Sequence, residues 1–199
     1  MINSSLKCSL PCTDVKKDFI VPGNSIDPDQ ISFIMISEAP PIDPDNYFYK
    51  KQNGTFFQTT QMAFMDAGIS ISSYNDLTNS GIYLTTAIKC SKQKYLVSAG
   101  TIKECSYILE SELEQFSEIK VIMCMGDFAI KAVNYITKRK YGRTVIPSGS
   151  TYKIRGGTYI LNGIRYFPSY TQTGESFDIE KSKRKMIAED IKTALTIIR

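Results

Sequence analysis

Residues 31–57, ISFIMISEAPPIDPDNYFYKKQNGTFF, decide the fold of this chain. The first six of them are apolar apart from Ser32 and rich in β-forming side chains, in a run too short for a buried helix. Pro40 and Pro41 end the run, because proline cannot donate to a strand ladder and disfavours helix in the residue before it. The stretch therefore predicts a buried strand with an acidic side chain, Glu38, at its carboxyl end.

Aromatic residues follow this strand in the same stretch: Tyr47, Phe48, Tyr49, Phe56 and Phe57. Ligands of open α/β sheets bind at the carboxyl ends of the strands. A carboxylate that faces aromatic rings suits a flat ligand with polar edges, such as a nucleobase, which stacks on rings and is recognised at its edge. The same residues also fit an ordinary strand–loop corner, with a solvated glutamate and aromatic side chains in the core.

The composition predicts one domain over residues 1–199, because a chain of this length with 42% hydrophobic residues can bury one sizeable core. The sequence shows no secretory signal and no run long enough to cross a bilayer, so we expect a cytoplasmic protein without a membrane partner. We also expect a monomer. The net charge of +4 permits a nucleic-acid partner. The chain has no histidine, which excludes histidine from acid–base catalysis and from metal binding.

Downstream of this stretch, apolar runs with strand character alternate with amphipathic helical patterns. Asn162-Gly163 is a strong signal for the turn of a hairpin. The expected elements are strands over residues 81–90 and 121–125, a hairpin over 158–167, helices over 61–67, 103–116, 127–136 and 178–198, a basic loop over 138–143 and an exposed polar loop over 168–177. This alternation predicts an α/β sandwich with a largely parallel sheet.

The cysteines form a spaced set that suggests a metal site. Cys8 and Cys12 lie in a turn-prone segment, Cys90 ends the second expected strand, and Cys105 opens the helix after it. Because the ends of neighbouring elements can converge, the four thiolates suit a zinc ion or a four-iron cluster, both of which accept ligation by sulfur alone. Independent buried thiols are the alternative interpretation. Cys124 lies among apolar strand residues and is expected to be a core side chain.

Several ordered motifs carry a resemblance to one known family. Residues 34–40, IMISEAP, match a motif in which a strand ends in Gly-Glu-Ala-Pro-Gly. At the start of the chain, the Cys8 and Cys12 pair followed by IVPG at 20–23 matches the opening of the family sequence. YLTTAIKC at 83–90 matches a strand that reads Tyr-Ile-Thr-Asn-Val-Val-Lys-Cys, and Cys105 lies where a fourth cysteine belongs. Residues 121–129 match a Gly-x-x-Ala strand–helix junction, and residues 155–170 match the approach to Pro-Thr-Tyr-His-Pro-Ser. In this order and over nearly the whole chain, the motifs resemble the uracil-DNA glycosylase superfamily, particularly its iron–sulfur-containing family-four branch.

The resemblance implies a three-layer α/β/α sandwich with a mostly parallel sheet that binds DNA, accommodates an extruded base and acts in base-excision repair. Such an enzyme would hydrolyse an N-glycosidic bond without a covalent intermediate. The implied catalytic residues are Glu38, which would position or activate water, and Thr171, beside the leaving base. The residues implied to bind the base are Ala39, Phe48, Phe57 and Thr86, with Phe48 or Phe57 as the stacking ring.

The same resemblance implies contacts to the DNA backbone and a cofactor. Ser169, Gln172 and Thr173 would lie against the DNA, and Phe177 would be either a wedge into the base stack or an anchor at a helix start. The implied ligands of a four-iron, four-sulfur cluster, with zinc as the alternative metal, are Cys8, Cys12, Cys90 and Cys105.

Two departures from the family pattern weaken the implied activity. The family's histidine position is Thr171 here, and a threonine cannot carry the positive charge that supports a departing base. The position of the asparagine that recognises uracil is Thr86, which offers one hydroxyl where an amide offers a donor and an acceptor. We therefore expect weak or absent uracil excision. The alternative function is a non-catalytic DNA- or nucleotide-binding protein on the same scaffold, with a structural metal cluster.

Overall fold

The protein has one central sheet, seen in a computed structural model that describes residues 3–22, 26–50, 53–93, 96–173, 177 and 180–199. Within these residues, the strands have the order β2-β1-β3-β5-β4. Their bounds are β1 Phe33–Ser37, β2 Ile82–Thr86, β3 Val121–Met125, β4 Tyr159–Leu161 and β5 Ile164–Ser169. All neighbours pair in parallel except β4, which runs antiparallel to β5. The expected α/β fold with a mostly parallel sheet is confirmed.

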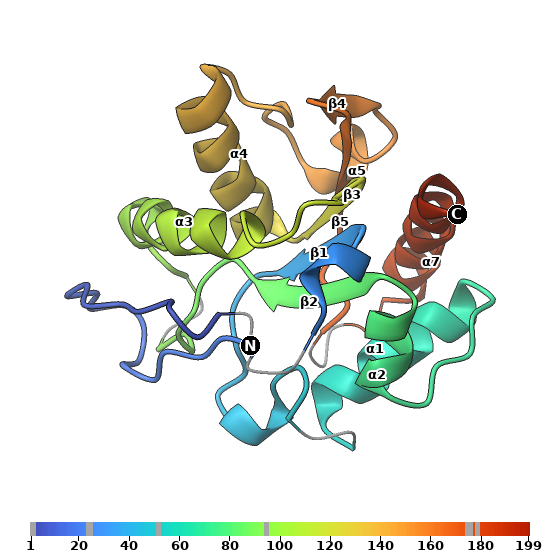
Figure 1. Cartoon of the computed structure of the whole chain (residues 1–199), viewed down its shortest axis with the longest axis horizontal. Coiled ribbons are helices and arrows are strands. Elements are labelled where there is room, and N and C mark those ends of the chain that lie inside the picture. The colour runs from blue at the N-terminus through green and yellow to red at the C-terminus, as the bar shows by residue number, and fades with distance from the viewer. Residues whose placement is uncertain (1–2, 23–25, 51–52, 94–95, 174–176, 178–179) are drawn as a thin grey trace.

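Helices cover both faces of the sheet (Figure 1). One face carries α3 (Ala99–Leu113) and α4 (Asp127–Tyr141), and the other carries α1 (Thr55–Asp66), α2 (Tyr74–Asn79) and α7 (Lys181–Ile198). The short elements are α5 (Thr151–Ile154) and the 3-10 helices η1 (Pro28–Gln30) and η2 (Pro44–Asn46). No helix in the described part of the chain is both long enough and apolar enough to cross a membrane.

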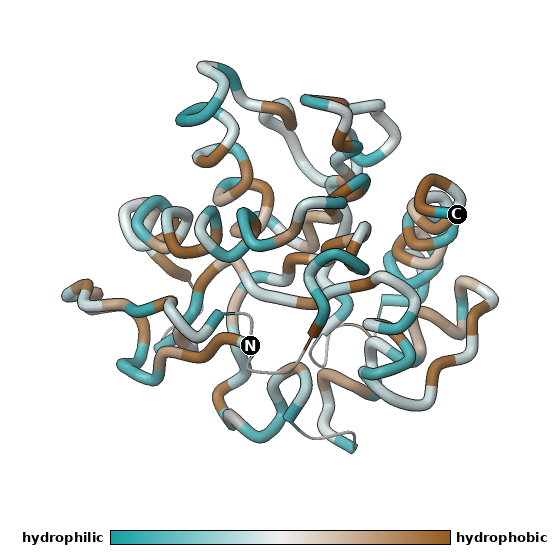
Figure 2. Tube along the Cα trace, in the orientation of Figure 1, coloured by the Kyte–Doolittle hydropathy of each residue, from teal (hydrophilic) through white to brown (hydrophobic). Residues whose placement is uncertain are grey.

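Two hydrophobic cores result from the alternation of strand side chains. In β1, Ile34 and Ile36 pack in the core under α3 and α4, whereas Phe33 and Met35 pack in the core under α1 and α7. Successive side chains of a strand point to opposite faces, so a strand covered on both sides must be apolar throughout. β1, β2 and β3 are buried along their whole length. The helices in Figure 2 alternate between apolar and polar residues, as expected for amphipathic helices that cover a sheet.

Most of the expected elements are present, and some begin or end elsewhere. The strand at residues 121–125 and the hairpin are confirmed; Asn162 and Gly163 have φ angles of 50° and 78°, as a type I′ turn requires. The helix expected at residues 61–67 is the second half of α1, so Phe56 and Phe57 lie in a helix and not in a loop. Helix α2 was not expected from the sequence, although Ser73 and Asp76 form a capping box at its start.

Both expected loops are corrected by the structure. The basic loop at residues 138–143 is largely the last turn of α4, which ends at Tyr141 and is capped by Gly142 in the left-handed conformation, with a φ angle of 73°. The polar loop at residues 168–177 is not exposed over its described part. Pro168 and Ser169 belong to β5, and Gln172 and Thr173 are buried against the sheet edge. The last helix, expected from residue 178, begins at Lys181, and residues 178–179 lie outside the described residues.

Candidate functional site

The carboxyl ends of β1, β3 and β5 bring Glu38 and Thr171 to the two sides of one glycine. Gly126 follows β3 and has a φ angle of 104°. A Cβ atom on Gly126 would lie 2.7 Å from Glu38 Cγ and 2.7 Å from Thr171 Oγ1. The two residues that the sequence predicts as catalytic therefore lie next to each other in the fold. The position between them has no space for a side chain and has a φ angle that favours glycine.

This meeting point is the place where the strand order reverses. From β1 the chain passes to β2 on one side and later to β3 on the other side of β1. The connections therefore diverge between β1 and β3, and at such a point open α/β sheets bind ligands outside the carboxyl ends of the strands. Glu38 follows β1 and Gly126 follows β3, so the region at the carboxyl ends of β1 and β3, which we call the crevice, is the candidate site.

Glu38 is held by groups from α4 and from the segment after β2. One carboxylate oxygen accepts a hydrogen bond from the backbone N–H of Phe128, at 3.4 Å, in the first turn of α4. The other oxygen lies 3.4 Å from Lys92 Nζ, and that ammonium lies 5.1 Å from the centre of the Phe128 ring. The positive end of the helix dipole and the ammonium both stabilise the carboxylate charge. Because the Glu38 side chain keeps 22% of its surface exposed, it can reach water and a ligand.

Thr171 uses its hydroxyl proton inside the protein. Its Oγ1 donates to the backbone carbonyl oxygen of Met125, at a distance of 3.3 Å. A hydroxyl has one proton, so in this arrangement Thr171 presents only lone pairs to the Glu38 side of the crevice. The hydroxyl must rotate away from Met125 before it can donate to a departing base.

The residues predicted to bind a base are packed in the core below the crevice. Thr86 is buried, and its hydroxyl lies 3.3 Å from the hydroxyl of Tyr47. Burial, and secondarily the charge of Glu112, raises the pKa of Tyr47 well above its usual value, so Tyr47 stays protonated. Phe48 packs on Tyr47, with ring centres 5.3 Å apart. Thr86 and Phe48 thus share one neighbour, but no ring face of Phe48 is open to a ligand.

The other predicted stacking ring, Phe57, is also closed. It makes an edge contact with Tyr74 at 4.8 Å between ring centres, and Phe48 contacts the same Tyr74 ring at 6.1 Å. Ala39 is buried beside the first turn of the loop after β1. The structure gathers these aromatic residues at one end of the sheet, as the sequence predicts, and uses them as core.

An open cavity of about 210 Å³ lies on the other side of Thr171, toward α7. Its lining includes Gly126, Thr171, Phe177, Lys183 and Arg184. Lys183 pairs with Glu180 at 2.7 Å, and Arg184 pairs with Asp66, so both cations already have acidic partners. The buried Phe177 packs under the Arg184 guanidinium, 5.5 Å from ring centre, which favours the anchor interpretation of Phe177 over the wedge.

The residues predicted to contact DNA face inward. Ser169 is fully buried and donates to a carboxylate oxygen of Asp190 at 2.7 Å. Asp190 also binds Arg155 at 2.8 Å, and burial raises the pKa of Asp190 despite these partners. Thr173 shares a hydrogen bond with Ser37, at 3.2 Å between hydroxyl oxygens. In this conformation these hydroxyl groups bind other parts of the protein and are not presented to a phosphate.

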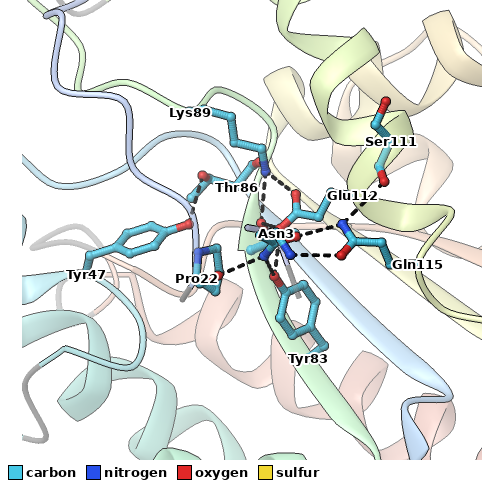
Figure 3. A network of polar contacts seen from close by, with 10 residues as sticks. Asn3, Pro22, Tyr47, Tyr83, Thr86, Lys89, Ser111, Glu112 and Gln115 are labelled. Carbon is cyan, nitrogen blue, oxygen red and sulfur yellow. Dashed lines mark hydrogen bonds and ion pairs between the residues drawn. The ribbon is translucent and has the colours of Figure 1, made fainter. Parts of the chain in front are cut away.

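A buried ion pair between Lys89, after β2, and Glu112, on α3, was not expected from the sequence (Figure 3). Lys89 and Glu112 form a salt bridge with both side chains fully buried, and the Lys89 ammonium also donates to Thr85 Oγ1 at 2.9 Å and to the Thr86 carbonyl oxygen. Glu112 accepts further hydrogen bonds from Tyr83 at 2.7 Å and from Thr85 at 2.8 Å. Together with Asn3, which donates to the Tyr83 hydroxyl at 2.8 Å, these residues form the Lys89–Glu112 network. The only signal in the sequence was a lysine at the end of an apolar strand.

The four predicted metal ligands line one cavity of about 310 Å³, the cysteine cavity. Cys8 and Cys12 come from the N-terminal segment, Cys90 follows β2, and Cys105 lies on α3. All are free thiols. Burial raises the pKa of Cys90 to about 12 and also raises that of Cys105. Cys124 lies apart from them, fully buried in β3, as expected for a core side chain.

The thiols as placed in the structure do not form a site for a single metal ion among the described residues. Among the described residues, no three cysteine, aspartate or glutamate side chains lie close enough to bind one metal ion. Tetrahedral zinc with bonds of about 2.3 Å requires sulfur atoms about 3.8 Å apart. The donor set consists of sulfur alone, and the cavity is larger than a single ion needs.

The fold and the crevice together define the class. The protein is an α/β/α domain that holds a carboxylate at the switch point of its sheet, opposite a loop that follows the last parallel strand. It belongs to the uracil DNA glycosylase superfamily, whose family model matches residues 25–189. The chain is also similar to a type-5 uracil-DNA glycosylase from Thermus thermophilus, with 27% identity over 100 residues, which are 50% of this chain and 46% of that protein. The match thus spans about half the length of the relative. The expected superfamily is confirmed, and assignment to the family-four branch stays a prediction.

Proposed function

We propose that this protein binds DNA at the crevice between β1 and β3 and hydrolyses the N-glycosidic bond of an extruded, damaged or deaminated base. The observation that carries the proposal is the placement of the Glu38 carboxylate and the Thr171 hydroxyl on either side of Gly126, at the switch point of the sheet. Membership of the superfamily supports DNA as the partner. The whole reaction rests on residues of this chain without any histidine.

In the proposed reaction, Glu38 orients a water molecule toward C1′ of the deoxyribose. The water oxygen bonds to C1′ as the C1′–N bond breaks, and the bonding electron pair leaves with the base. Positive charge that develops on the sugar is stabilised by the nearby carboxylate, which then takes the proton of the water. The Phe128 N–H and Lys92 hold that carboxylate in place, since each contacts one of its two oxygens.

The leaving base receives little help in this protein. Negative charge develops on the base as it leaves, so a hydrogen bond donated to the base stabilises the transition state more than the ground state. Thr171 can supply one hydroxyl proton, which now binds the Met125 carbonyl oxygen. We infer that excision is slow and acts mainly on bases that leave easily. We also infer that Thr171 contributes more to binding the base than to the rate of bond cleavage.

A second candidate function is a non-catalytic DNA- or nucleotide-binding protein. The burial of Thr86, Phe48 and Phe57 favours it, because these side chains do not line an open base pocket. The engagement of the Thr171 proton favours it as well. The intact placement of Glu38 favours the enzyme.

One assay separates the two functions. The protein is incubated with duplexes that carry a single uracil, hypoxanthine, xanthine or alkylated base, and abasic sites are measured. The enzyme proposal expects abasic sites with at least one of these duplexes, and expects Glu38→Gln to remove them while binding to the duplex remains. Binding without abasic sites on any duplex would identify the non-catalytic function instead.

We also propose that Cys8, Cys12, Cys90 and Cys105 hold a four-iron, four-sulfur cluster. Four free thiols from three separate segments line one cavity of about 310 Å³, and ligation by sulfur alone suits such a cluster. A bound cluster would cross-link the N-terminal segment to β2 and α3. Zinc is the alternative, and a pocket of independent thiols is the outcome if neither metal is present.

The cluster proposal is tested on protein purified without oxygen. We expect a brown colour, with iron and sulfide in cluster stoichiometry. Cys105→Ser should bleach the protein, whereas Cys124→Ser, a matched change at the core cysteine, should leave the colour unchanged. A colourless protein with one zinc would overturn the iron assignment, and a protein without metal would overturn the site.

A further inference from the structure

The segment after β5 crosses the crevice at one residue, Gln172. The residue before it, Thr171, is hydrogen-bonded to the Met125 carbonyl oxygen at the end of β3. The residue after it, Thr173, is hydrogen-bonded to Ser37 at the end of β1. Since β1 and β3 are neighbours in the sheet, Gln172 bridges the gap between their carboxyl ends, which is the switch point.

Gln172 is fully buried and its amide is unused. Its exposed fraction is 0%, and neither Nε2 nor Oε1 has a hydrogen-bond partner among the residues that the structure describes. Other glutamines of the chain use their amides: Gln61 donates to the Ile71 carbonyl oxygen at 2.7 Å, and Gln93 to that of Val15 at 3.0 Å. Among the described residues, the buried side-chain polar atoms without a partner are the two atoms of the Gln172 amide and the hydroxyl of Tyr74.

A buried polar group without a partner destabilises the folded state, because it loses its hydrogen bonds to water and gains none. Such groups in native proteins call for an explanation, and a ligand that supplies the missing partners is one. An apolar side chain of the same length would fill the same space without this penalty. The amide of Gln172 thus contributes nothing that folding alone requires.

We propose that the amide of Gln172 recognises the edge of the extruded base. An amide offers one donor and one acceptor side by side, which match the adjacent acceptor and donor on the pairing edge of a base. Thr86 offers a single hydroxyl, and that hydroxyl lies against Tyr47. Gln172 therefore restores from the β5 side the paired contact that the β2 side lacks. This inference rests on the proposed function, because it assigns the base contact of the same site.

The amide also has no internal partner that fixes its orientation, again among the described residues. Rotation of the amide by 180° exchanges its donor and acceptor. The same side chain can then match a base with the opposite order of donor and acceptor. We therefore expect Gln172 to provide affinity for bases in general at the extruded position and to discriminate weakly between uracil and hypoxanthine.

The test replaces the amide without changing the length of the side chain. Gln172→Met is made in a Glu38→Gln background, which prevents turnover, and affinity is measured by fluorescence anisotropy. The probes are duplexes of one sequence that carry uracil, hypoxanthine, a tetrahydrofuran abasic analogue or no lesion. We expect Gln172→Met to weaken binding to the uracil and hypoxanthine duplexes by at least about fivefold, and to leave binding to the abasic duplex within about twofold.

The melting temperature is a second measurement, because a structural role of the amide and a role in base binding predict different changes in it. Removing an unused amide should leave the melting temperature unchanged or raise it. The matched control is Gln115→Met, the same change at a glutamine whose amide oxygen and nitrogen both bind Asn3, at 2.8 Å and 3.0 Å. This control should lower the melting temperature and leave all four affinities unchanged.

Three outcomes would overturn the inference. If Gln172→Met keeps the affinity for the uracil and hypoxanthine duplexes, the amide does not contact the base. If it weakens binding to the abasic duplex as much as binding to the lesion duplexes, the amide contacts the DNA backbone. If it lowers the melting temperature as Gln115→Met does, the amide is structural. Failure of the proposed function is distinguishable, since the unsubstituted crevice would then bind the lesion duplexes no better than the undamaged one.

Discussion

The Lys89–Glu112 network and the Thr171–Thr173 segment are two groups of buried polar residues with opposite properties. In the network, all three protons of the Lys89 ammonium are donated, to Thr85, Thr86 and Glu112. In the segment after β5, the amide of Gln172 is unused among the described residues. The first group satisfies its polar atoms within the protein, and the second leaves one amide without a partner in the described part of the chain.

This difference separates a structural from a functional use of buried polarity. The network ties Asn3 of the N-terminal segment, the end of β2 and α3 into one arrangement, and the same segments carry Cys90 and Cys105. A buried ion pair seldom adds much stability but can fix how segments fit together. The crevice instead keeps an unpaired amide and a constrained glycine, which cost stability and are therefore expected at a functional site.

The largest effect is expected from breaking the network at one partner. Lys89→Met leaves the Glu112 carboxylate buried without a cation, which should lower the free energy of unfolding by about 3–5 kcal/mol in urea titrations. Adding Glu112→Gln should recover much of this loss, because a neutral amide keeps hydrogen bonds to Tyr83 and Thr85 without an unpaired charge. A cost below about 1 kcal/mol for Lys89→Met would show that the network does not act as a charged, desolvated pair.

The next effect concerns the glycine in the crevice. Gly126→Ala places a Cβ atom 2.7 Å from both Glu38 Cγ and Thr171 Oγ1, in a residue with a φ angle of 104°. We expect a loss of about 1–3 kcal/mol in stability and, in the abasic-site assay, a fall in rate of about a hundredfold as Glu38 is displaced.

Gly142→Ala is the matched control, because Gly142 also has a positive φ angle, 73°, but has open space around its Cβ position. It should reproduce the backbone strain without affecting the rate. Equal rates for the two alanine variants would contradict a catalytic position for Glu38.

A smaller effect is expected from restoring the donor that Thr171 replaces. Thr171→His should raise uracil excision by at least about tenfold, since an imidazolium opposite Glu38 stabilises charge on the leaving base. Glu38→Gln in this variant should remove the gain. Rapid uracil excision by the unsubstituted protein would contradict this expectation, because threonine would then be adequate at position 171.

The smallest effect is expected at a satisfied polar group on the surface, the counterpart of the buried network. Asp76 caps α2 by accepting hydrogen bonds from Ser72 and Ser73, which lower its pKa from 3.8 to about 2. A carboxyl whose pKa is lower in the folded state than in the unfolded state stabilises the folded state at pH values above the unfolded-state pKa. This contribution disappears as the pH falls from about 3.8 to 2. Melting temperatures of Asp76→Asn should therefore depend less on pH over this interval than those of the unsubstituted protein.

Much of the fold could be predicted because its signals are local. The apolar run before Pro40, the run at residues 121–125 and the Asn162-Gly163 turn each encode their own backbone conformation, and all three are present. Glu38 was also predictable, since a proline stop after a buried strand places the preceding polar residue at the sheet edge. The sequence also grouped Cys8, Cys12, Cys90 and Cys105 as one set, and these four side chains line one cavity.

The remaining properties depend on residues far apart in the sequence. No local pattern shows that Phe48, Phe57 and Thr86 are packed into the core and closed to a ligand, since an aromatic loop and an aromatic core have the same composition. Nothing near Lys89 in the sequence indicates Glu112, which lies on another element.

The sequence by itself therefore determined most of the elements, the order of the motifs and the chemical groups available to the site. Only the tertiary structure decided which polar groups find partners, because hydrogen bonds and ion pairs form between segments that meet through packing of the sheet and its helices. That is why Gly126 between Glu38 and Thr171, and the unused amide of Gln172 across the crevice, became visible only in the folded chain.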